Sequence, residues 1–247
     1  MTVLAPRQLP LQQFYRSGPL PCPYLPGRIE RKLFTRLSGP WSTEVNATLT
    51  RSGFRRSHDI LYRPVCPDCV ACVPVRIVIA EFRPDRTMRR LMKNNADLYL
   101  IDAPAVATTE QFDLFHDYQQ VRHGESDMAR MGLADFAAMV QDGQADTSLI
   151  ELRLRATHQL VGAVLVDRVG DGYSAVYSFF DPSAPKRSLG AALVLSLIDR
   201  CRQEGLPYLY LGYWIEGSRK MSYKARFQPL EGLGSGGWRK LTFQTGR

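Results

Sequence analysis

Residues 172–213 constrain the fold more than any other stretch, because they predict a strand, a turn, a helix and a second strand in that order. Residues 172–180 are rich in aromatic and small side chains and follow an Asp-Gly turn signal, which is typical of a strand leaving a hairpin. After a short polar loop, Ser188 can cap a helix that ends at Gly205. Apolar side chains at helical spacing indicate that helix, namely Leu189, Leu193, Leu197 and Ile198. Residues 207–213 are expected to form the second strand.

The entrance of this helix carries an R-x-x-G-x-A pattern, formed by Arg187, Gly190 and Ala192. Small residues there let backbone N–H groups and the positive end of the helix dipole approach a phosphate. The alternative is that Gly190 and Ala192 only let the helix pack closely on a sheet. Order and motif resemble the acyl-donor turn of the GCN5-related N-acetyltransferase fold. That resemblance implies that Arg187 and Gly190 hold the terminal phosphates of the donor.

Composition favours a cytoplasmic protein with a polyanionic partner. The chain has 247 residues, 45% of them hydrophobic and 23% charged, and a formal net charge of +8. Its longest apolar run, residues 191–198, is far shorter than the roughly 20 residues of a membrane-spanning helix. The N-terminus lacks the basic-then-apolar pattern of a signal peptide. We therefore expect no membrane partner.

Five cysteines indicate metal or redox chemistry more than a disulfide framework. Cys66, Cys69 and Cys72 make two consecutive C-x-x-C spacings, which suit zinc or an iron–sulfur cluster. A fourth ligand would be Cys22 or His58. In the alternative, these are buried thiols that pack as small apolar residues. Cys201, inside the apolar helix, is expected in the core.

The first 95 residues are predicted to form a smaller, cysteine-containing N-terminal domain. Its opening, through about Gly53, is proline-rich and expected to be irregular, and residues 75–82 alternate as a strand does. Residues 85–94 predict a helix with one basic face and no acidic partner on it. That face is either solvated or bound to a nucleic-acid backbone, and it consists of Arg86, Arg89, Arg90 and Lys93.

Residues 96–247 are predicted to form a second, catalytic domain. Residues 98–101 indicate a strand, Thr108 opens a capping box for a helix that closes near Gly124, and residues 133–141 indicate another helix. Residues 148–155, 160–169 and 172–180 then predict three antiparallel strands. With the phosphate turn, this is the order of the GCN5-related fold. The fold class is therefore expected to be α+β.

Three segments, 21–26, 54–74 and 212–229, resemble the aminoacyl-tRNA–protein transferases, and the similarity to their short bacterial branch runs over nearly the whole chain. The resemblance implies transfer of leucine from leucyl-tRNA to the N-terminal amine of proteins that begin with Asp or Glu, which marks them for degradation. In the related eukaryotic arginyltransferases, an N-terminal C-x-x-C motif holds an iron–sulfur cluster. Here Leu25 stands at the second cysteine position of that motif, and the downstream cysteines are respaced.

This reaction requires little beyond positioning, a weak base and stabilisation of the oxyanion, because the aminoacyl ester is already activated. No cofactor is required for the chemistry. Tyr177 and Asp181 flank the end of the central strand, and Asp181 either orients and deprotonates the amine or caps a turn. Lys220, Lys224 and Arg226 lie among aromatic residues, a pattern that suits the single-stranded CCA end of tRNA. Candidates to meet the acidic side chain of the acceptor are Arg55, Arg56 and Arg76.

Two other functions are open. A coenzyme A-dependent acyltransferase of the same fold would also use the turn at Gly190, although the overall basic balance is more than coenzyme A needs. A non-catalytic RNA-binding protein with a metal knuckle would leave Tyr177 and Asp181 without a role. An arginyl donor would require acidic groups in its pocket, which the sequence does not locate.

Overall fold

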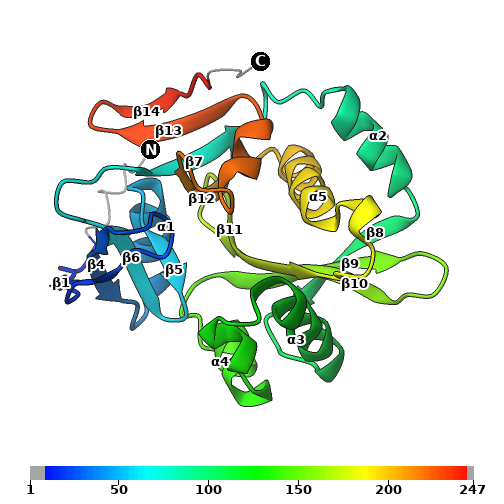
Figure 1. The fold of residues 1–247 in the computed structure, drawn as a ribbon, viewed down its shortest axis with the longest axis horizontal. Coiled ribbons are helices and arrows are strands. Elements are labelled where there is room, and N and C mark those ends of the chain that lie inside the picture. Colours follow the sequence, from blue (N-terminus) through cyan, green and yellow to red (C-terminus); the bar gives the residue numbers. More distant parts are fainter. Residues whose placement is uncertain (1–8, 244–247) are drawn as a thin grey trace, which may run out of the picture.

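Two β-sheets organise residues 9–243, the part of the chain that this computed structural model describes (Figure 1). The larger sheet has eight strands, in the spatial order β14 (Gly237–Lys240), β13 (Leu230–Gly234), β7 (Cys72–Val78), β12 (Tyr208–Ile215), β11 (Gly172–Phe180), β10 (Leu160–Arg168), β9 (Thr147–Leu154) and β8 (Leu98–Pro104). The smaller sheet has four, in the order β1 (Tyr15–Arg16), β4 (Lys32–Arg36), β6 (Ile60–Pro64) and β5 (Arg55–Ser57). A separate ribbon joins β2 (Leu20–Pro21) to β3 (Ile29–Glu30).

The opening of the chain is more regular than its prolines suggest. The expectation of an irregular segment through Gly53 is wrong, because this segment contains β1 to β4 and the helix α1 (Ser42–Arg51). The prolines of this segment end at Pro40, and the next twelve residues, 41–52, contain no glycine or proline and can form a helix. Buried apolar side chains from α1 and the small sheet form their own core, with Leu37, Val45, Phe54 and Leu61 at its centre.

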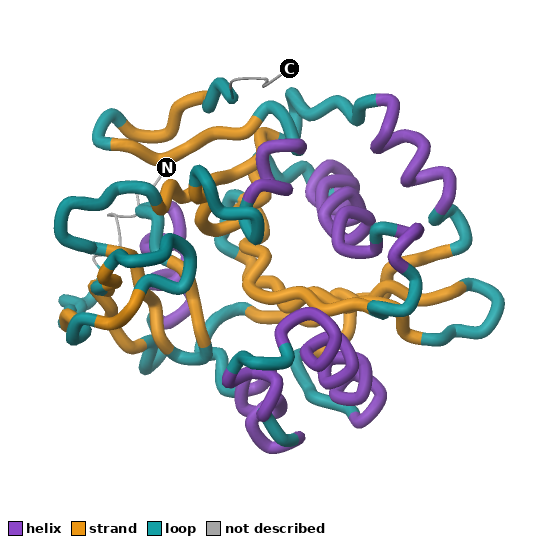
Figure 2. The backbone as a smooth tube through the Cα atoms, in the orientation of Figure 1, coloured by secondary structure: helices purple, strands orange, loops and turns teal. Residues whose placement is uncertain are grey.

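Helices cover both faces of the large sheet, as Figures 1 and 2 show. On one face lie α3 (Thr109–His123) and α4 (Leu133–Gln141), and on the other lie α2 (Arg86–Asn94) and α5 (Leu189–Gln203). The predicted positions of these four helices are confirmed. Local caps explain why: Asp85 accepts the N–H of Met88, and Thr108 and Gln111 form the predicted capping box. Short 3-10 turns follow at η1 (Asp127–Arg130), η2 (Pro185–Arg187) and η3 (Ser222–Arg226).

The central strand β10 is buried on both faces, which explains its nearly continuous apolar sequence. Successive side chains of a strand point to opposite faces. Val164 and Val166 accordingly join the core beneath α5, whereas Ala163 and Leu165 join the core beneath α3 and α4. The three predicted antiparallel strands β9, β10 and β11 are confirmed.

Strands β11 and β12, both predicted within residues 172–213, form a parallel pair with α5 as the crossover. They pair over only three positions, from Gly172 opposite Tyr208 to Ser174 opposite Tyr210. The approach at Gly172 is close, since a Cβ there would lie 2.1 Å from the carbonyl oxygen of Tyr208. Beyond Ser174 the two strands separate, and the large sheet is split along this line.

The change from the small to the large sheet comes between β6 and β7, earlier than the predicted domain boundary at residue 95. Strand β7 pairs with β12 and β13, and α2 contributes Met88 to the core of the large sheet. Strands β13 and β14 were not foreseen in the sequence. None of the helices in residues 9–243 is both long and apolar enough to cross a bilayer.

Candidate active site

The split between β11 and β12 opens into a cavity of about 670 Å³. Both faces of the sheet line it, since α3 contributes Gln119 and α5 contributes Leu193 and Leu197. The small sheet closes one side through β5, and the segment around η3 closes another. A ligand that enters the split therefore meets residues from both ends of the chain.

Arg55 holds the two separated strands at their distance. Its guanidinium donates to the carbonyl oxygens of Leu211 on β12, at 3.0 Å, and of Ala175 and Val176 on β11, at 3.1 and 2.6 Å. These carbonyls lie along the part of the split where β11 and β12 no longer pair with each other. Gly212 makes room for the side chain: its φ is +73°, and a Cβ there would lie 1.5 Å from Nη1 of Arg55. Arg55, a candidate for acceptor binding, thus lies in the wall of the cavity and also supports the split.

Lys224 is the second cation in the split. Only 3% of it is exposed, and its Nζ donates to the carbonyl oxygen of Tyr213 at 2.5 Å and lies 3.3 Å from Sδ of Met221. Burial lowers the pKa of Lys224 well below its ordinary value, and the charge of Arg55 lowers it further. The predicted tRNA contacts Lys220 and Arg226 are exposed on the same segment, whereas Lys224 faces the interior.

No aspartate or glutamate is among the described residues that line this cavity. The basic side chains in its wall are Arg55, Arg56, Lys220 and Lys224, and of these Arg56 is paired with Asp167. Much of the remaining wall is apolar, with Met128, Met131, Met139, Val164, Val176, Leu193 and Leu197. The cavity therefore combines uncompensated positive charge with an apolar surface, a combination that suits an acidic group and an aliphatic group together.

Gln119 and Tyr177 form a polar pair in the same wall. Nε2 of Gln119 donates to the Tyr177 hydroxyl, and burial raises the pKa of this phenol above its ordinary value. Oε1 of Gln119 is buried and accepts no hydrogen bond from any described residue, although the side chain is completely buried. Gln119 was missed in the sequence. The available signal was its position four residues after Phe115, which puts an amide on the buried face of α3.

The other two acceptor candidates, Arg56 and Arg76, already have close partners. Arg56 and Asp167, each 1% exposed in its side chain, share two hydrogen bonds of 2.7 Å, and Nη1 of Arg56 donates to the His58 carbonyl at 2.8 Å. Arg76 is paired with Glu231 at 2.8 Å and lies outside the cavity wall. Among the described residues, Arg56 and Arg76 each pair with a carboxylate, whereas Arg55 bonds only neutral backbone carbonyls.

Asp181 and the helix entrance take structural contacts. The Asp181 carboxylate accepts the N–H of Ser183 at 2.8 Å and does not line the cavity, which favours the turn-capping alternative. Ser188 is left-handed, with φ of 49°, and its side chain makes no cap bond, so the expected cap is wrong. A Cβ at Gly190 would lie 2.8 Å from the ring of Phe180, which supports the packing interpretation of this glycine. The phosphate interpretation stays a prediction.

Arg187 and the basic helix lie beyond the cavity wall. Arg187 donates to Oδ1 of Asn95 at 3.0 Å and forms an ion pair with Asp97, so the segment after α2 holds it. The basic side chains of α2 are exposed to solvent, namely Arg86, Arg89, Arg90 and Lys93. Arg89 also donates to the carbonyl of Pro84. The structure thus leaves this face accessible to a polyanion.

The four N-terminal cysteines lie in one neighbourhood, next to the cavity. Burial raises the pKa of the Cys72 thiol to about 12, and the nearby Cys66, Cys22 and Cys69 add to the rise. At neutral pH this thiol is protonated. Within residues 9–243 no group of three or more histidine, cysteine, aspartate or glutamate side chains is arranged to hold a metal ion, so the thiols do not fit a metal as they stand. Metal or cluster binding stays a prediction.

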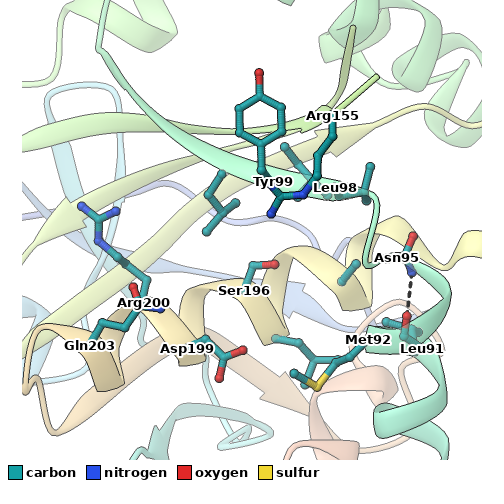
Figure 3. A pocket seen from close by; sticks show the side chains of 14 residues that line it. Leu91, Met92, Asn95, Leu98, Tyr99, Arg155, Ser196, Asp199, Arg200 and Gln203 are labelled. Atoms are coloured by element: carbon teal, nitrogen blue, oxygen red, sulfur yellow. Dashed lines mark hydrogen bonds between the residues drawn. The ribbon is translucent and has the colours of Figure 1, made fainter. Parts of the chain in front are cut away.

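A second cavity, of about 420 Å³, lies between α2, α5 and β8 (Figure 3). Its charged side chains are largely paired: Arg200 with Asp102 and Glu204, while Arg155 lies 5.6 Å from the centre of the Tyr99 ring. Asn95, at one end in Figure 3, donates to the carbonyl of Leu91. This second cavity has a carboxylate, Asp199, in its wall, and neither β11 nor β12 lines it. It therefore lacks the carboxylate-free, basic and apolar wall of the first cavity.

Comparison with known proteins supplies relatives along the whole chain. The family models described as "Arginine-tRNA-protein transferase", C terminus and N terminus, match residues 110–234 and 20–90. The aspartate/glutamate leucyltransferase of Gluconacetobacter diazotrophicus is 53% identical, over 98% of this chain and 92% of its own. That of Granulibacter bethesdensis is 53% identical over 94% and 86%, and that of Paramagnetospirillum magneticum 51% over 92% and 93%. Among solved structures, L-PGS from Bacillus licheniformis superposes with a TM-score of 0.45 at 10% identity, over 59% of this chain and 46% of that one.

Proposed function

Since this chain belongs to the arginine-tRNA-protein transferase family, we propose that it transfers leucine from leucyl-tRNA to the N-terminal amine of proteins that begin with Asp or Glu. The observation that carries the proposal is the composition of the cavity at the split, which is positive and apolar and has no carboxylate among its described residues. Peptide-bond formation by such an enzyme marks the acceptor for degradation in the N-degron pathway.

The donor follows from the apolar part of the wall. A leucyl side chain gains free energy by leaving water, at roughly 25 cal/mol per Å² of buried apolar area. An arginyl side chain would bring a guanidinium next to that of Arg55, with no carboxylate among the described lining residues to neutralise it. Like charges in a site of low dielectric repel strongly. The cavity therefore favours leucine over arginine.

The acceptor follows from the positive part of the wall. Carbonyl oxygens satisfy the hydrogen bonds of Arg55 but do not neutralise its charge. An acidic side chain does both, and its hydrogen bond to a cation is about twice as strong as a neutral one. We therefore favour Arg55 over Arg56 and Arg76 as the arginine that meets the acceptor.

The rest of the chain supplies positioning for tRNA. The exposed cations of α2, with Lys220 and Arg226, can pair with the tRNA backbone, and exposed Tyr223 beside them can stack on an unpaired base. The split parallel pair around α5 is the part of the fold that resembles the GCN5-related acyltransferases, with the cysteine-containing N-terminal segment packed beside it. This chain needs no covalent nucleophile of its own, because the ester of the donor is already activated.

The test is transfer of labelled amino acid from charged tRNA to short peptides. We expect leucine, and not arginine, to reach a peptide that begins with Asp, and the otherwise identical peptide that begins with Asn to be a poor acceptor. Comparing peptides is cleaner than removing Arg55, because Arg55 also supports the strands. Equal transfer of arginine, or transfer from acetyl-coenzyme A in place of leucyl-tRNA, would overturn the proposal.

A further inference from the structure

Lys224 is a buried lysine that has no anionic partner within residues 9–243. Its two close polar contacts are the Tyr213 carbonyl and the Met221 sulfur, and both can only accept hydrogen bonds. An ammonium in this place would carry its full charge in the interior next to Arg55. A neutral amine would satisfy both contacts with its two N–H groups and keep its lone pair for a third direction, the cavity that it lines.

A second atom in the cavity also lacks a donor. Oε1 of Gln119 is buried and receives no hydrogen bond from the described residues, although buried carbonyl oxygens are nearly always paired. Gln119 and Lys224 both line the cavity, but Oε1 is enclosed, so the lone pair of Lys224 is the acceptor that faces a ligand. An ammonium group is a ligand with several N–H donors and fits this lone pair.

We infer that Lys224 is the general base of the transfer, and that it takes a proton from the N-terminal ammonium of the acceptor. This inference rests on the proposed function. The depressed pKa of Lys224 agrees with it, since a lysine with an ordinary pKa would already be protonated at neutral pH. It also differs from the role of a tRNA phosphate contact that the sequence of residues 220–226 suggested.

The step balances as follows. Lys224 takes one proton from the ammonium, and the resulting amine attacks the leucyl carbonyl carbon, so that a carbon–nitrogen bond forms. The ester bond to the terminal ribose then breaks, and the ribose oxygen leaves with a second proton from the attacking nitrogen. Lys224 finally releases its proton to solvent. No oxidant, metal or cofactor enters.

Other charged and titratable side chains line the cavity around Lys224. They are Tyr24, Arg55, Arg56, His58 and Tyr62 from the N-terminal part of the chain, Tyr118 and His123 from α3, Tyr177 from β11, and Lys220 and Tyr223 from its own segment. Tyr213 lies behind it and bonds the carbonyls of Gly53 and Tyr62. Burial and nearby Lys220 lower the pKa of His123 below its ordinary value.

The experiment is single-turnover transfer of leucine to an Asp-starting peptide between pH 6.5 and 9, corrected for hydrolysis of the ester. Below about pH 8 the free acceptor amine is mostly protonated. We expect the Lys224→Met rate to rise about tenfold per pH unit up to about pH 8, because only the fraction of free amine changes. The wild-type rate should be higher but should fall more steeply as the pH is lowered, because the wild type then loses its base as well as the free amine. The deficit of Lys224→Met should therefore be largest at pH 9 and narrow as the pH falls through the pKa of Lys224.

Two further variants separate a base from a structural or electrostatic role. Lys224→Arg carries a permanent positive charge, keeps a donor for Tyr213 and cannot accept a proton, and we expect it to be as impaired as Lys224→Met at pH 7. Lys220→Met is the matched control on the same exposed segment: it should weaken tRNA binding and flatten its salt dependence without changing the shape of the pH profile.

An equal deficit of Lys224→Met at every pH, near-normal activity of Lys224→Arg, or a loss of tRNA affinity in Lys224→Met as large as in Lys220→Met would each overturn the inference. If Lys224→Met does not fold by circular dichroism, Lys224→Arg alone decides. Failure of the wild-type protein to transfer leucine would instead refute the proposed function, so the two failures are distinguishable.

Discussion

Removing Arg56 should destabilise the protein severely, because it would leave a buried carboxylate without its main partner. Arg56 and Asp167 are each 1% exposed in their side chains and are joined by two hydrogen bonds of 2.7 Å. Breaking a buried pair by removing one partner costs about 3–5 kcal/mol. In Arg56→Met the Asp167 carboxylate keeps only the hydroxyl of Thr147, at 2.8 Å, and the amide of Asn46, at 3.1 Å.

The magnitude agrees with a count of the bonds that are lost. Two charge-assisted hydrogen bonds contribute roughly 1.5–3 kcal/mol each, which gives about 3–6 kcal/mol. The assay is urea unfolding followed by fluorescence and circular dichroism, with the m-value checked for two-state behaviour. Arg36→Met is the matched control, since Arg36 pairs with Asp59 at 2.8 Å but is 71% exposed, and it should cost less than about 1 kcal/mol.

The double variant Arg56→Met, Asp167→Leu tests the cause. If the uncompensated carboxylate is responsible, removing both charges should recover much of the loss, with a coupling free energy of about 2 kcal/mol or more. A cost of Arg56→Met no larger than that of Arg36→Met, or additive effects in the double variant, would refute the reasoning. A large rise in the KM of Arg56→Met for the acceptor, without loss of stability, would indicate that Arg56 binds the acceptor.

Three further outcomes test other parts of the chain. Gly190→Ala should lower the free energy of unfolding by about 1–3 kcal/mol, because its Cβ would press on the Phe180 ring, and adding Phe180→Leu should restore part of that loss. Loss of tRNA binding at unchanged stability would favour the phosphate interpretation instead. Replacing both Arg90 and Lys93 by Glu should weaken tRNA binding and lower the slope of log affinity against log salt by up to about 0.9 for each phosphate contact, whereas an unchanged slope would make this a plain solvated face. The Cys72 thiol, with its pKa raised to about 12, should be alkylated slowly at pH 7.5 and faster as the pH rises towards that value. Rapid alkylation at pH 7.5 would contradict a protonated thiol, and so would metal found by elemental analysis of protein purified without air.

Sequence reasoning predicted the parts of the fold whose signals are local. The helix from Thr109 to His123 is marked by a capping box in consecutive residues, and the strand, turn, helix and strand of residues 172–213 lie within one short stretch. Such signals depend on neighbours within a few positions. The prediction that the segment through Gly53 is irregular was wrong for the same reason. Its prolines are a local signal against helix, whereas α1 is stabilised by packing on the small sheet.

The site was predicted only in part, because its geometry depends on distant contacts. Arg55, Tyr177 and Lys224 were selected by residue type and motif, yet their roles depend on contacts made after folding. Arg55 bonds a carbonyl 156 positions away, and Lys224 is distinguished from exposed Lys220 only by burial. Residue type and spacing alone carry no signal for either.

Because Arg55 bridges β11 and β12, the N-terminal and C-terminal halves of the chain depend on each other for their structure. A segment that begins at residue 96 would lack both Arg55 and β7. The carbonyls of Leu211 and Val176 would then lose the Arg55 donor, and β12 would lose its antiparallel neighbour. An evolving lineage could not exchange the C-terminal half for another acyltransferase half without rebuilding the split. We therefore expect the halves to be inherited together, and an insertion between β6 and β7 to be tolerated only where it leaves the reach of Arg55 unchanged.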